Sequence, residues 1–163
     1  MKKSDSIHER IFSREEIKQQ VTRLRLKSKT IAFTNGVFDI LHEGHIAVLS
    51  EAASYADVLI VGINSDSSVK KIKGENRPIN NEHSRAIIMA SLIMVDAVVI
   101  FDEETPLELI KIITPDVLIK GGDYTQETIV GAKEVLEAGG RVEIIPILEG
   151  FSTTGIIKKI SKE

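Results

Sequence analysis

Two histidines and a glycine lie close together in residues 33–45, FTNGVFDILHEGH. The chain has four histidines, and His42 and His45 are three residues apart, near the start of a predicted helix. This spacing puts both imidazoles on one side of a helical turn. Gly44 between them has no side chain, so a ligand can approach the backbone closely. Because a helix N-terminus also offers free N–H groups and a positive dipole end, the stretch predicts a phosphate-binding corner.

Two other interpretations of the histidine pair have to be weighed. A zinc site would need a third ligand, and no nearby histidine or carboxylate has the usual spacing. The spacing alone also leaves open that one histidine is a core residue and the other a helix cap. The predicted strands and helices around the two histidines are therefore needed to choose between these alternatives.

The composition is that of an ordinary globular protein and narrows the classes of function. The 163 residues fit one domain, with 42% apolar and 28% charged residues. A formal net charge of −3 argues against a general affinity for nucleic acid. Since cysteine is absent, disulfides, thiolate metal sites and cysteine nucleophiles are excluded. No apolar run reaches the roughly 18 residues of a membrane span, and residues 1–12 lack the apolar segment of a secretion signal, so a cytoplasmic protein is expected.

Apolar, β-branched segments alternate with helical patterns along the chain. Strands are predicted at residues 30–34, 58–63, 97–101, 117–119 and 142–147. Helices are predicted at residues 13–27, 45–55, 81–95 and 126–138, from Thr105 onward, and after residues 152–154. This order predicts an α/β fold, a doubly wound Rossmann-like parallel sheet of five strands in a single domain. We expect an N-terminal helical extension at residues 1–29 and the main domain at residues 30–163, with ligands bound at the carboxyl ends of the strands.

Several residues mark where these helices begin and end. Ser13 and Glu16 have the spacing of a capping box. Thr105 is predicted to cap the helix that follows it, and Pro106 is predicted as the first residue of that helix. The pair Gly139-Gly140 predicts the end of the helix at residues 126–138.

The histidine motif and its neighbours resemble a known enzyme family. The pattern HxGH after a first strand, in the stretch TNGVFDILHEGH, is similar to the signature of the nucleotidyltransferase superfamily, in its cytidylyltransferase-like branch. A second similar motif is GFSTTGIIKKI at residues 150–160, a Ser-Thr-Thr turn that opens a helix. On its own that turn would be an ordinary helix cap. Beside the first motif, it resembles the second phosphate corner of the family.

The resemblance implies roles for particular residues. Residues 64–79 form a basic segment, predicted as a solvated loop, in which the family's lysines meet nucleotide phosphates. The implied catalytic residues are His42, His45 and Lys73. The implied nucleotide-binding residues are Thr34, Asn35, Gly36, Phe38, Asp39, Gly44, Lys70, Arg85, Gly121, Gly122, Asp123, Ser152, Thr153 and Thr154. Mg²⁺ is the expected cofactor, held mainly by the ATP phosphates, with Asp39 as either a magnesium ligand or a residue that orders its loop.

Within the family, residues 11–160 most resemble the adenylyltransferase half of bacterial ADP-heptose synthesis enzymes. Those enzymes join ATP to D-glycero-β-D-manno-heptose 1-phosphate, for lipopolysaccharide synthesis. The supporting stretches include VGINSDSSVKKIKG, RPIN and KGGDY, although the last could be a plain glycine turn. Glycerol-3-phosphate cytidylyltransferases usually carry an arginine before the Ser-Thr-Thr turn, and residues 146–150, PILEG, have none.

The resemblance also implies partners and leaves alternatives. ATP and a sugar 1-phosphate are the expected substrates, and a homodimer is expected because relatives commonly form one. The heptose adenylyltransferase is fused to a sugar kinase in many bacteria, and this chain of 163 residues would be the stand-alone form. The alternatives are a glycerol-3-phosphate cytidylyltransferase, an FMN adenylyltransferase of the same fold, or a nucleotide-binding regulatory module without turnover. A dinucleotide-binding dehydrogenase is disfavoured because no GxGxxG follows the first strand.

Overall fold

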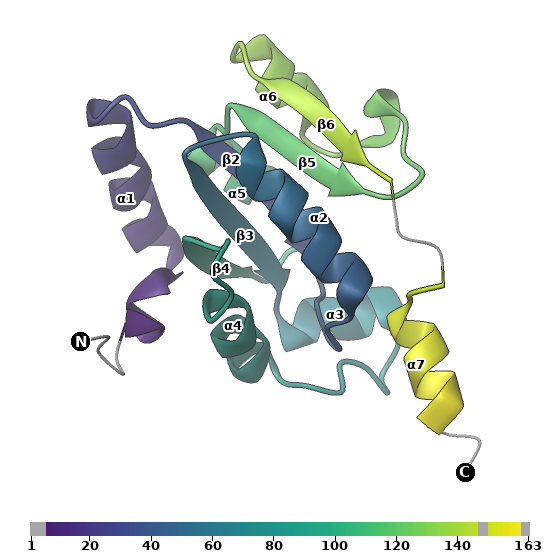
Figure 1. Cartoon of the computed structure of the whole chain (residues 1–163). Coiled ribbons are helices and arrows are strands. Elements are labelled where there is room, and N and C mark those ends of the chain that lie inside the picture. Colours follow the sequence, from purple (N-terminus) through teal and green to yellow (C-terminus); the bar gives the residue numbers. More distant parts are fainter. Residues whose placement is uncertain (1–5, 147–149, 161–163) are drawn as a thin grey trace.

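The computed structural model describes residues 6–146 and 150–160, in which six parallel strands form one sheet (Figure 1). The strands are β1 Ile11–Phe12, β2 Ile31–Gly36, β3 Val58–Asn64, β4 Ala97–Phe101, β5 Val117–Gly121 and β6 Arg141–Ile145, in the order β1-β4-β3-β2-β5-β6. The parallel α/β fold is confirmed, and the expected number of five strands is wrong. The additional strand, β1, pairs with β4 at the edge of the sheet. Two residues are too few to show a periodic pattern in the sequence.

The helices agree with the predicted segments with three differences. They are α1 Arg14–Leu26, α2 Glu43–Ser54, α3 Asp66–Lys73, α4 Glu82–Ala90, α5 Leu107–Ile113, α6 Ala132–Glu137 and α7 Thr153–Ile160, with short 3₁₀ turns η2 His8–Arg10 and η3 Gln126–Thr128. The basic segment after β3 is a helix, α3, rather than a loop, because Ser65 caps it by accepting from the Ser68 N–H. Residues 126–138 are split into η3 and α6 by Gly131, whose φ is +86°. The helix predicted at residues 81–95 ends as α4 at Ala90.

Of the three predicted helix boundaries, two are confirmed and one is wrong. Ser13 and Glu16 form the reciprocal capping box of α1. Gly139, with φ +85°, follows α6 as expected. The predicted Thr105 cap is wrong: Pro106 occupies the N-cap position of α5, without a side-chain hydrogen bond to the helix.

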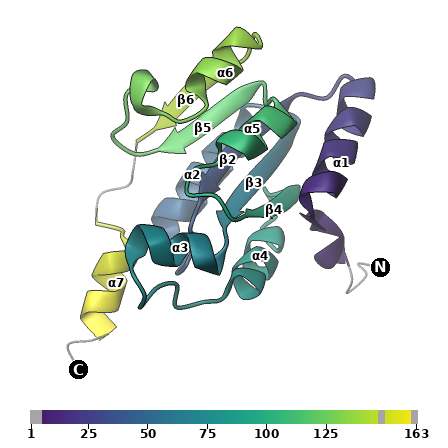
Figure 2. The same ribbon diagram turned by 180° about the vertical axis from the view of Figure 1, so that it is seen from behind.

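Helices cover both faces of the sheet, and a hydrophobic cluster lies under each layer. On one face α2 and α4 pack over residues such as Val61 and Ile119 of the central strands. On the other face α1, α5 and α6 pack over Phe33 and Leu118 (Figure 2). The α1 residue Ile17 is fully buried in that second cluster. The segment before β2 therefore contributes to the main core.

The order of the strands creates the place where a ligand can enter. From β2 the chain adds β3 and β4 on one side, and then returns to add β5 and β6 on the other. Connections that leave in opposite directions open a crevice at the carboxyl ends of the two adjacent strands, here β2 and β5. In the described part of the chain, no helix is long and apolar enough to cross a membrane.

Candidate active site

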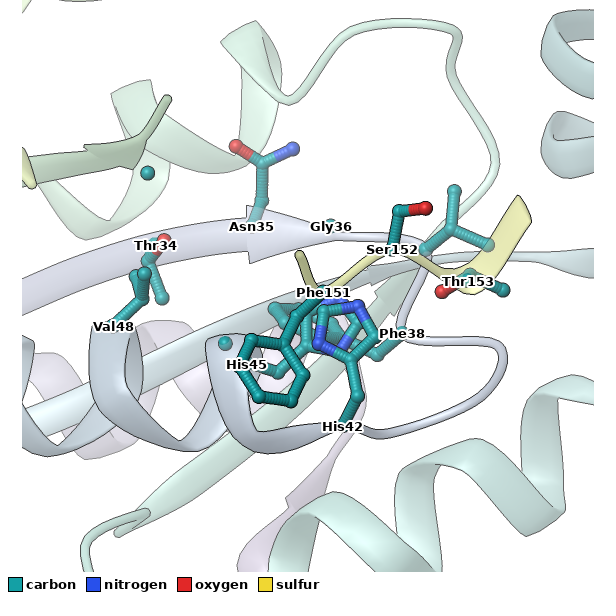
Figure 3. Close-up of a pocket in the computed structure, with 13 residues that line it drawn as sticks. Thr34, Asn35, Gly36, Phe38, His42, His45, Val48, Phe151, Ser152 and Thr153 are labelled. Atoms are coloured by element: carbon teal, nitrogen blue, oxygen red, sulfur yellow. The ribbon is translucent and has the colours of Figure 1, made fainter. Parts of the chain in front are cut away.

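A cavity of about 310 Å³ lies at the carboxyl ends of β2 and β5, on the face of the sheet that α2 covers (Figure 3). We call it the histidine cavity. It is lined by Thr34, Asn35, Gly36, Val37, Phe38, His42, Gly44, His45, Val48, Gly121, Phe151, Ser152 and Thr153. Residues from three separate parts of the chain therefore meet here: the β2–α2 corner, the end of β5 and the start of α7.

The two histidines lie where the sequence predicts, at the N-terminus of α2. His42 is the N-cap residue, and its ring stacks on that of His45 with 3.8 Å between centroids and 24° between planes. Phe38 meets the His45 ring edge-on at 5.4 Å. Neither imidazole side chain forms a helix-capping hydrogen bond, and both Nδ1 atoms are buried without a hydrogen-bond partner among the described residues. Buried polar atoms are nearly always paired, so two unpaired ring nitrogens in residues that line a cavity indicate a ligand site.

The environment of the pair keeps it uncharged. Burial lowers the pKa of His42. Burial, together with the neighbouring His42 charge, lowers the pKa of His45 to about 4. In the ligand-free protein both imidazoles are therefore neutral at pH 7, and a bound anion would shift both pKa values upward by favouring the charged forms.

Gly44 is required by the packing around His42. A Cβ at this position would lie 3.1 Å from the His42 Nδ1 atom and 3.3 Å from the Phe151 Cβ atom. Those separations are tighter than ordinary contacts, so a methyl group would displace the ring or the aromatic residue behind it. The glycine thus keeps the imidazole against the helix end.

The Ser-Thr-Thr turn acts as a helix cap and also lines the site. The Ser152 Oγ accepts from the Gly155 N–H at 3.0 Å, as the ordinary interpretation of this turn predicts. The Thr153 hydroxyl donates to the Ile40 carbonyl at 3.2 Å, which joins α7 to the loop after β2. The N-terminus of α7 therefore faces the cavity beside the N-terminus of α2. Two positive dipole ends at one cavity favour an anion with several charges.

A second cavity, of about 240 Å³, adjoins the first and carries cationic side chains. We call it the arginine cavity. It is lined by Val37, Phe38, Asp39, His45, Lys73, Arg77, Thr153 and Thr154. His45 and Thr153 line both cavities, so an elongated anion could extend from one to the other. The predicted catalytic residue Lys73 lies at the end of α3 and lines the arginine cavity, together with Thr153 and Thr154 of α7.

Asp39 organises the wall of the arginine cavity. Its carboxylate is almost fully buried and accepts from Arg77 Nε at 2.7 Å and from the backbone N–H groups of Ile79 and Asn80 at 2.9 and 2.8 Å. Burial acts to raise the pKa of Asp39, but the donors of Asn80, Ile79 and Arg77 outweigh it and hold the pKa below its usual value. Because these donors occupy both oxygens, the contacts support the loop-ordering role of Asp39.

Arg85 lies behind the site. Its buried guanidinium donates to the Val37 carbonyl at 2.7 Å, the Asn80 carbonyl at 2.9 Å and the Asp66 carboxylate at 2.8 Å. It lines none of the cavities at the strand ends. Arg85 therefore holds the loop at Val37 in place and does not line the cavities where a nucleotide was predicted to contact it.

With this geometry in view, comparison with known proteins gives the family. The family model described as cytidylyltransferase-like matches residues 33–161. The chain belongs to this family. The match begins in β2, before the histidine pair, and extends past α7. Both motifs that the sequence predicts as phosphate corners are therefore inside the region that matches the cytidylyltransferase-like domain.

Curated relatives include longer, bifunctional proteins. The chain is 53% identical over 150 residues to the bifunctional protein HldE of Koribacter versatilis (strain Ellin345), covering 92% of this chain and 31% of that protein. It is 52% identical over 161 residues to the protein of the same name from Aliarcobacter butzleri (strain RM4018), covering 99% of this chain and 33% of that protein. The cytidylyltransferase-like chain thus spans about one third of the length of these relatives.

Two solved structures are similar in fold. One is a lipopolysaccharide core biosynthesis protein from Thermoplasma volcanium GSS1, with a TM-score of 0.59 and 29% identity, covering 74% of this chain and 97% of that one. The other is a pantoate-beta-alanine ligase from Francisella tularensis, with a TM-score of 0.63, covering 94% of this chain and 78% of that one. At 17% identity, the second similarity concerns the fold alone.

Some predicted binding residues of the cytidylyltransferase-like domain lie outside the cavities. Lys70 is half exposed on α3 and its Nζ lies 4.0 Å from a Glu75 carboxylate oxygen. Asp123 is exposed, and the Gly122 N–H donates to the Ile145 carbonyl. Lys70, Gly122 and Asp123 are absent from the cavity linings. Ile147 and Leu148, where the family's glycerol-phosphate branch has an arginine, lie outside the described residues.

The structure also places residues that the sequence named only within the KGGDY and GFSTTG stretches, or did not assign to the site. Phe151 lies 6.3 Å from the His42 ring, and Val48 lies against Gly121, where a Cβ would be 3.0 Å from the valine. Lys120 and Tyr124 line a third cavity, of about 360 Å³, on the other face of the β2 end. We call it the lysine cavity. In the sequence, Lys120 is marked by its position as a charged residue at the end of the otherwise apolar strand VLIKG.

Proposed function

We propose that this domain is an adenylyltransferase that joins ATP to D-glycero-β-D-manno-heptose 1-phosphate and releases pyrophosphate, giving ADP-heptose for lipopolysaccharide precursor synthesis. The observation that carries the proposal is the stacked histidine pair, with two unpaired Nδ1 atoms, between the N-termini of α2 and α7. Those donors and dipoles suit a triphosphate whose α-phosphorus is to be attacked.

The reaction needs alignment and charge stabilisation more than proton transfer. A phosphate monoester has a second pKa near 6, so the acceptor is mostly a dianion at neutral pH and needs no general base. The enzyme has to hold two anions that repel each other and to stabilise the charge on the leaving pyrophosphate. In this proposal His42 and His45 contact the triphosphate, and Ser152 and Thr153 hold its outer phosphates. Lys73, which lines both the arginine cavity and the lysine cavity, bridges the α- and β-phosphates or contacts the acceptor phosphate.

Magnesium enters this proposal as part of the nucleotide substrate. When bound to the triphosphate it neutralises the oxygens of the leaving pyrophosphate. Among the residues that the structure describes, no cluster of three or more histidine or carboxylate side chains could hold a metal ion. Both carboxylate oxygens of Asp39 already accept hydrogen bonds from Arg77, Ile79 and Asn80. This supports a magnesium ion that is bound by the ATP phosphates and not by Asp39.

The choice of substrate rests on the similarity to the heptose branch of the family. The matching HldE relatives are bifunctional and about 50% identical to this chain, as expected for enzymes that fuse the adenylyltransferase to a kinase. The similar solved structure of a lipopolysaccharide core biosynthesis protein supports the same pathway. We further propose that the enzyme works in the cytoplasm, where ATP is available, and that it forms a homodimer.

Pyrophosphate release tests the proposal directly. With Mg²⁺ present, ATP and CTP are each combined with heptose 1-phosphate, glycerol 3-phosphate and FMN. Release with ATP and heptose 1-phosphate alone is the expected result. Release with CTP and glycerol 3-phosphate, or with ATP and FMN, would replace the substrate assignment by one of the alternatives. ATP binding without release in any combination would favour the regulatory module.

A further inference from the structure

The end of β2 separates two cavities that lie on opposite faces of the sheet. Successive side chains of a strand point to opposite faces. Thr34 points toward Val48 of α2 and lines the histidine cavity, whereas Asn35 points away from α2 (Figure 3). The lysine cavity lies on the Asn35 side, and both cavities share the residues 35–37 as a common rim.

This arrangement fits the geometry of phosphoryl-group displacement. In such a reaction the attacking and leaving oxygens lie roughly in line, on opposite sides of the phosphorus. An α-phosphorus held over the Gly36 backbone would have the histidine and arginine cavities on one side and the lysine cavity on the other. If the pyrophosphate leaves toward the histidines and α7, the acceptor has to come from the lysine cavity.

Lys120 is the main charge on that side of the rim. It is partly buried at the carboxyl end of β5, and its Nζ donates to the Oδ1 of Asn35 across the two strands of the switch point. Among the described residues, no carboxylate lies within ion-pair distance of this ammonium group. Burial lowers the pKa of Lys120 to about 8, which leaves it mostly charged at pH 7.

A partly buried lysine without a countercharge is unfavourable for the free protein. Within residues 6–146 and 150–160, the desolvation of the ammonium group is offset only by one neutral amide oxygen, Asn35 Oδ1. Such arrangements are typical of sites in which the ligand supplies the missing charge. Lys73, which reaches the same cavity from α3, adds a second cation at this end.

The rest of the lysine cavity offers groups of a different kind. Glu104, Thr105 and Thr128 contribute carboxylate and hydroxyl groups, and Tyr124 contributes a half-exposed aromatic ring. The cavity therefore combines a cationic end, next to the strand tips, with an end that can hydrogen-bond several hydroxyl groups. A polyol or sugar that carries one phosphate has the matching distribution of charge and hydroxyls.

We infer that Lys120, oriented by Asn35, binds the phosphate of the acceptor substrate in the lysine cavity, on the side of the β2 end opposite the leaving pyrophosphate. The inference rests on the proposed function and assigns a site to its second substrate. An acceptor phosphate oxygen forms the new bond to the α-phosphorus. The bond from that phosphorus to the pyrophosphate oxygen breaks, and its electron pair leaves with the pyrophosphate. No proton has to move in this step.

The test compares Lys120→Met with Lys133→Met in the full chain. Lys133 is exposed on α6 and lines none of the three cavities at the strand ends, so its substitution removes the same charge without touching the lysine cavity. For each protein we would measure KM for ATP and for heptose 1-phosphate by pyrophosphate release. Calorimetry would give the Kd of α,β-methylene-ATP, and thermal unfolding would give the Tm.

The expected result is a selective effect on the acceptor. Lys120→Met raises KM for heptose 1-phosphate by about 10- to 100-fold, the usual effect of losing a hydrogen bond to a charged group. KM for ATP and the Kd of the analogue stay within about twofold of wild type, and Lys133→Met changes neither. The Tm of Lys120→Met is the same as wild type or higher, because an uncompensated buried charge is removed.

Two results would overturn the inference. A rise confined to KM for ATP, or to the Kd of its analogue, would assign Lys120 to the nucleotide. A lower Tm with unchanged KM for the acceptor would make the Lys120–Asn35 hydrogen bond a structural contact only.

Failure of the proposed function gives a different pattern. In that case wild type releases no pyrophosphate with heptose 1-phosphate, and calorimetry with mannose 1-phosphate, glycerol 3-phosphate and FMN replaces the kinetic assay. Binding of any of these by wild type and by Lys133→Met, but not by Lys120→Met, would support Lys120 as a phosphomonoester receptor. Equal binding by all three proteins, or binding by none, would overturn it.

Discussion

In the proposed reaction, the histidine pair would bind a polyanion without a permanent charge of its own. Stacking at 3.8 Å and burial keep both rings neutral, and their Nδ1 atoms have no partners in the described part of the chain. A neutral ring avoids the large desolvation cost of a buried cation. In the proposed reaction, the N–H group that each neutral ring already carries would donate a hydrogen bond to the charge that develops on the leaving group.

Removing one imidazole should therefore lower the rate far more than the stability. We expect His45→Ala to lower kcat by about 10²–10³-fold, the usual cost of losing one charge-stabilising donor. Far-UV circular dichroism and thermal unfolding should be nearly unchanged, because the ring has no hydrogen-bonded protein partner at Nδ1. An unfolded variant, or a folded one with full turnover, would instead identify His45 as a core residue.

The low pKa of His45 also predicts how stability depends on pH. The folded protein holds this imidazole neutral down to about pH 4, whereas in the unfolded chain it binds a proton near its ordinary pKa of 6.5. As pH falls from about 6.5 toward 4, the unfolded state gains a proton that the folded state lacks, so the free energy of unfolding decreases. The contribution is at most about 1.4 kcal/mol per pH unit and is reduced by partial exposure.

Urea unfolding of wild type and His45→Gln at pH 7, 6 and 5 would measure this dependence. The variant should lose less stability than wild type over that interval, since it lacks the titrating group. Parallel curves for the two proteins would show that His45 does not carry the effect.

Among the elements, the N-terminus of α2 depends on a glycine that a helix would not otherwise favour. Replacing Gly44 with alanine should add up to about 1 kcal/mol of helix propensity. The new Cβ would crowd the His42 ring at 3.1 Å and offset that gain. We expect kcat/KM to fall by about 10- to 100-fold through displacement of the ring, with the free energy of unfolding within about 1 kcal/mol of wild type.

Ser50→Ala is the matched control for that variant, because Ser50 is exposed on the same helix. Kinetics and urea unfolding of both variants would separate the two effects. Unchanged kinetics in Gly44→Ala would contradict a role for the glycine in placing His42.

The loop after β2 depends on the Asp39 contacts to residues 77–80. Asp39→Ala would leave Arg77 and two backbone N–H groups without their buried acceptor. We expect a loss of about 2–4 kcal/mol in the free energy of unfolding, and loss of turnover. The exposed Asp102 provides the control, Asp102→Ala, for which a change within about 0.5 kcal/mol is expected. A stability loss of the same size in both variants would contradict the special role of Asp39.

For the molecule as a whole, the sheet unites the segment before residue 30 with the rest of the chain. Ile17 of α1 is fully buried against the same cluster as Phe33 and Leu118. Ile17→Ala should lower the free energy of unfolding by about 2–5 kcal/mol, the usual range for such a truncation in a core. Leu26→Ala, on the same helix but 83% exposed, should change it by less than about 0.5 kcal/mol.

Urea unfolding at one pH would measure both α1 variants. The sequence predicts an N-terminal helical extension at residues 1–29, and a small effect of Ile17→Ala would mean that this extension contributes little to the stability of the core. A large effect would assign them to the same cooperative unit as the site.

The sequence by itself determined the local features of this protein. Strand and helix periods, the Ser13–Glu16 capping box and the HxGH and Ser-Thr-Thr turns depend on residues a few positions apart. The parallel α/β fold and the helix starts at both motifs could therefore be predicted. The short strand β1 and the eight-residue helix α3 gave too weak a pattern.

Only the tertiary structure decided which distant residues meet. Lys120 reaches Asn35 across 85 positions, and Arg77 reaches Asp39 across 38. Such contacts depend on the order of strands in the sheet, which places β5 beside β2, and no local pattern encodes that order. The same strand order created two cavities on opposite sides of the β2 end, where the two substrates of the proposed reaction would meet.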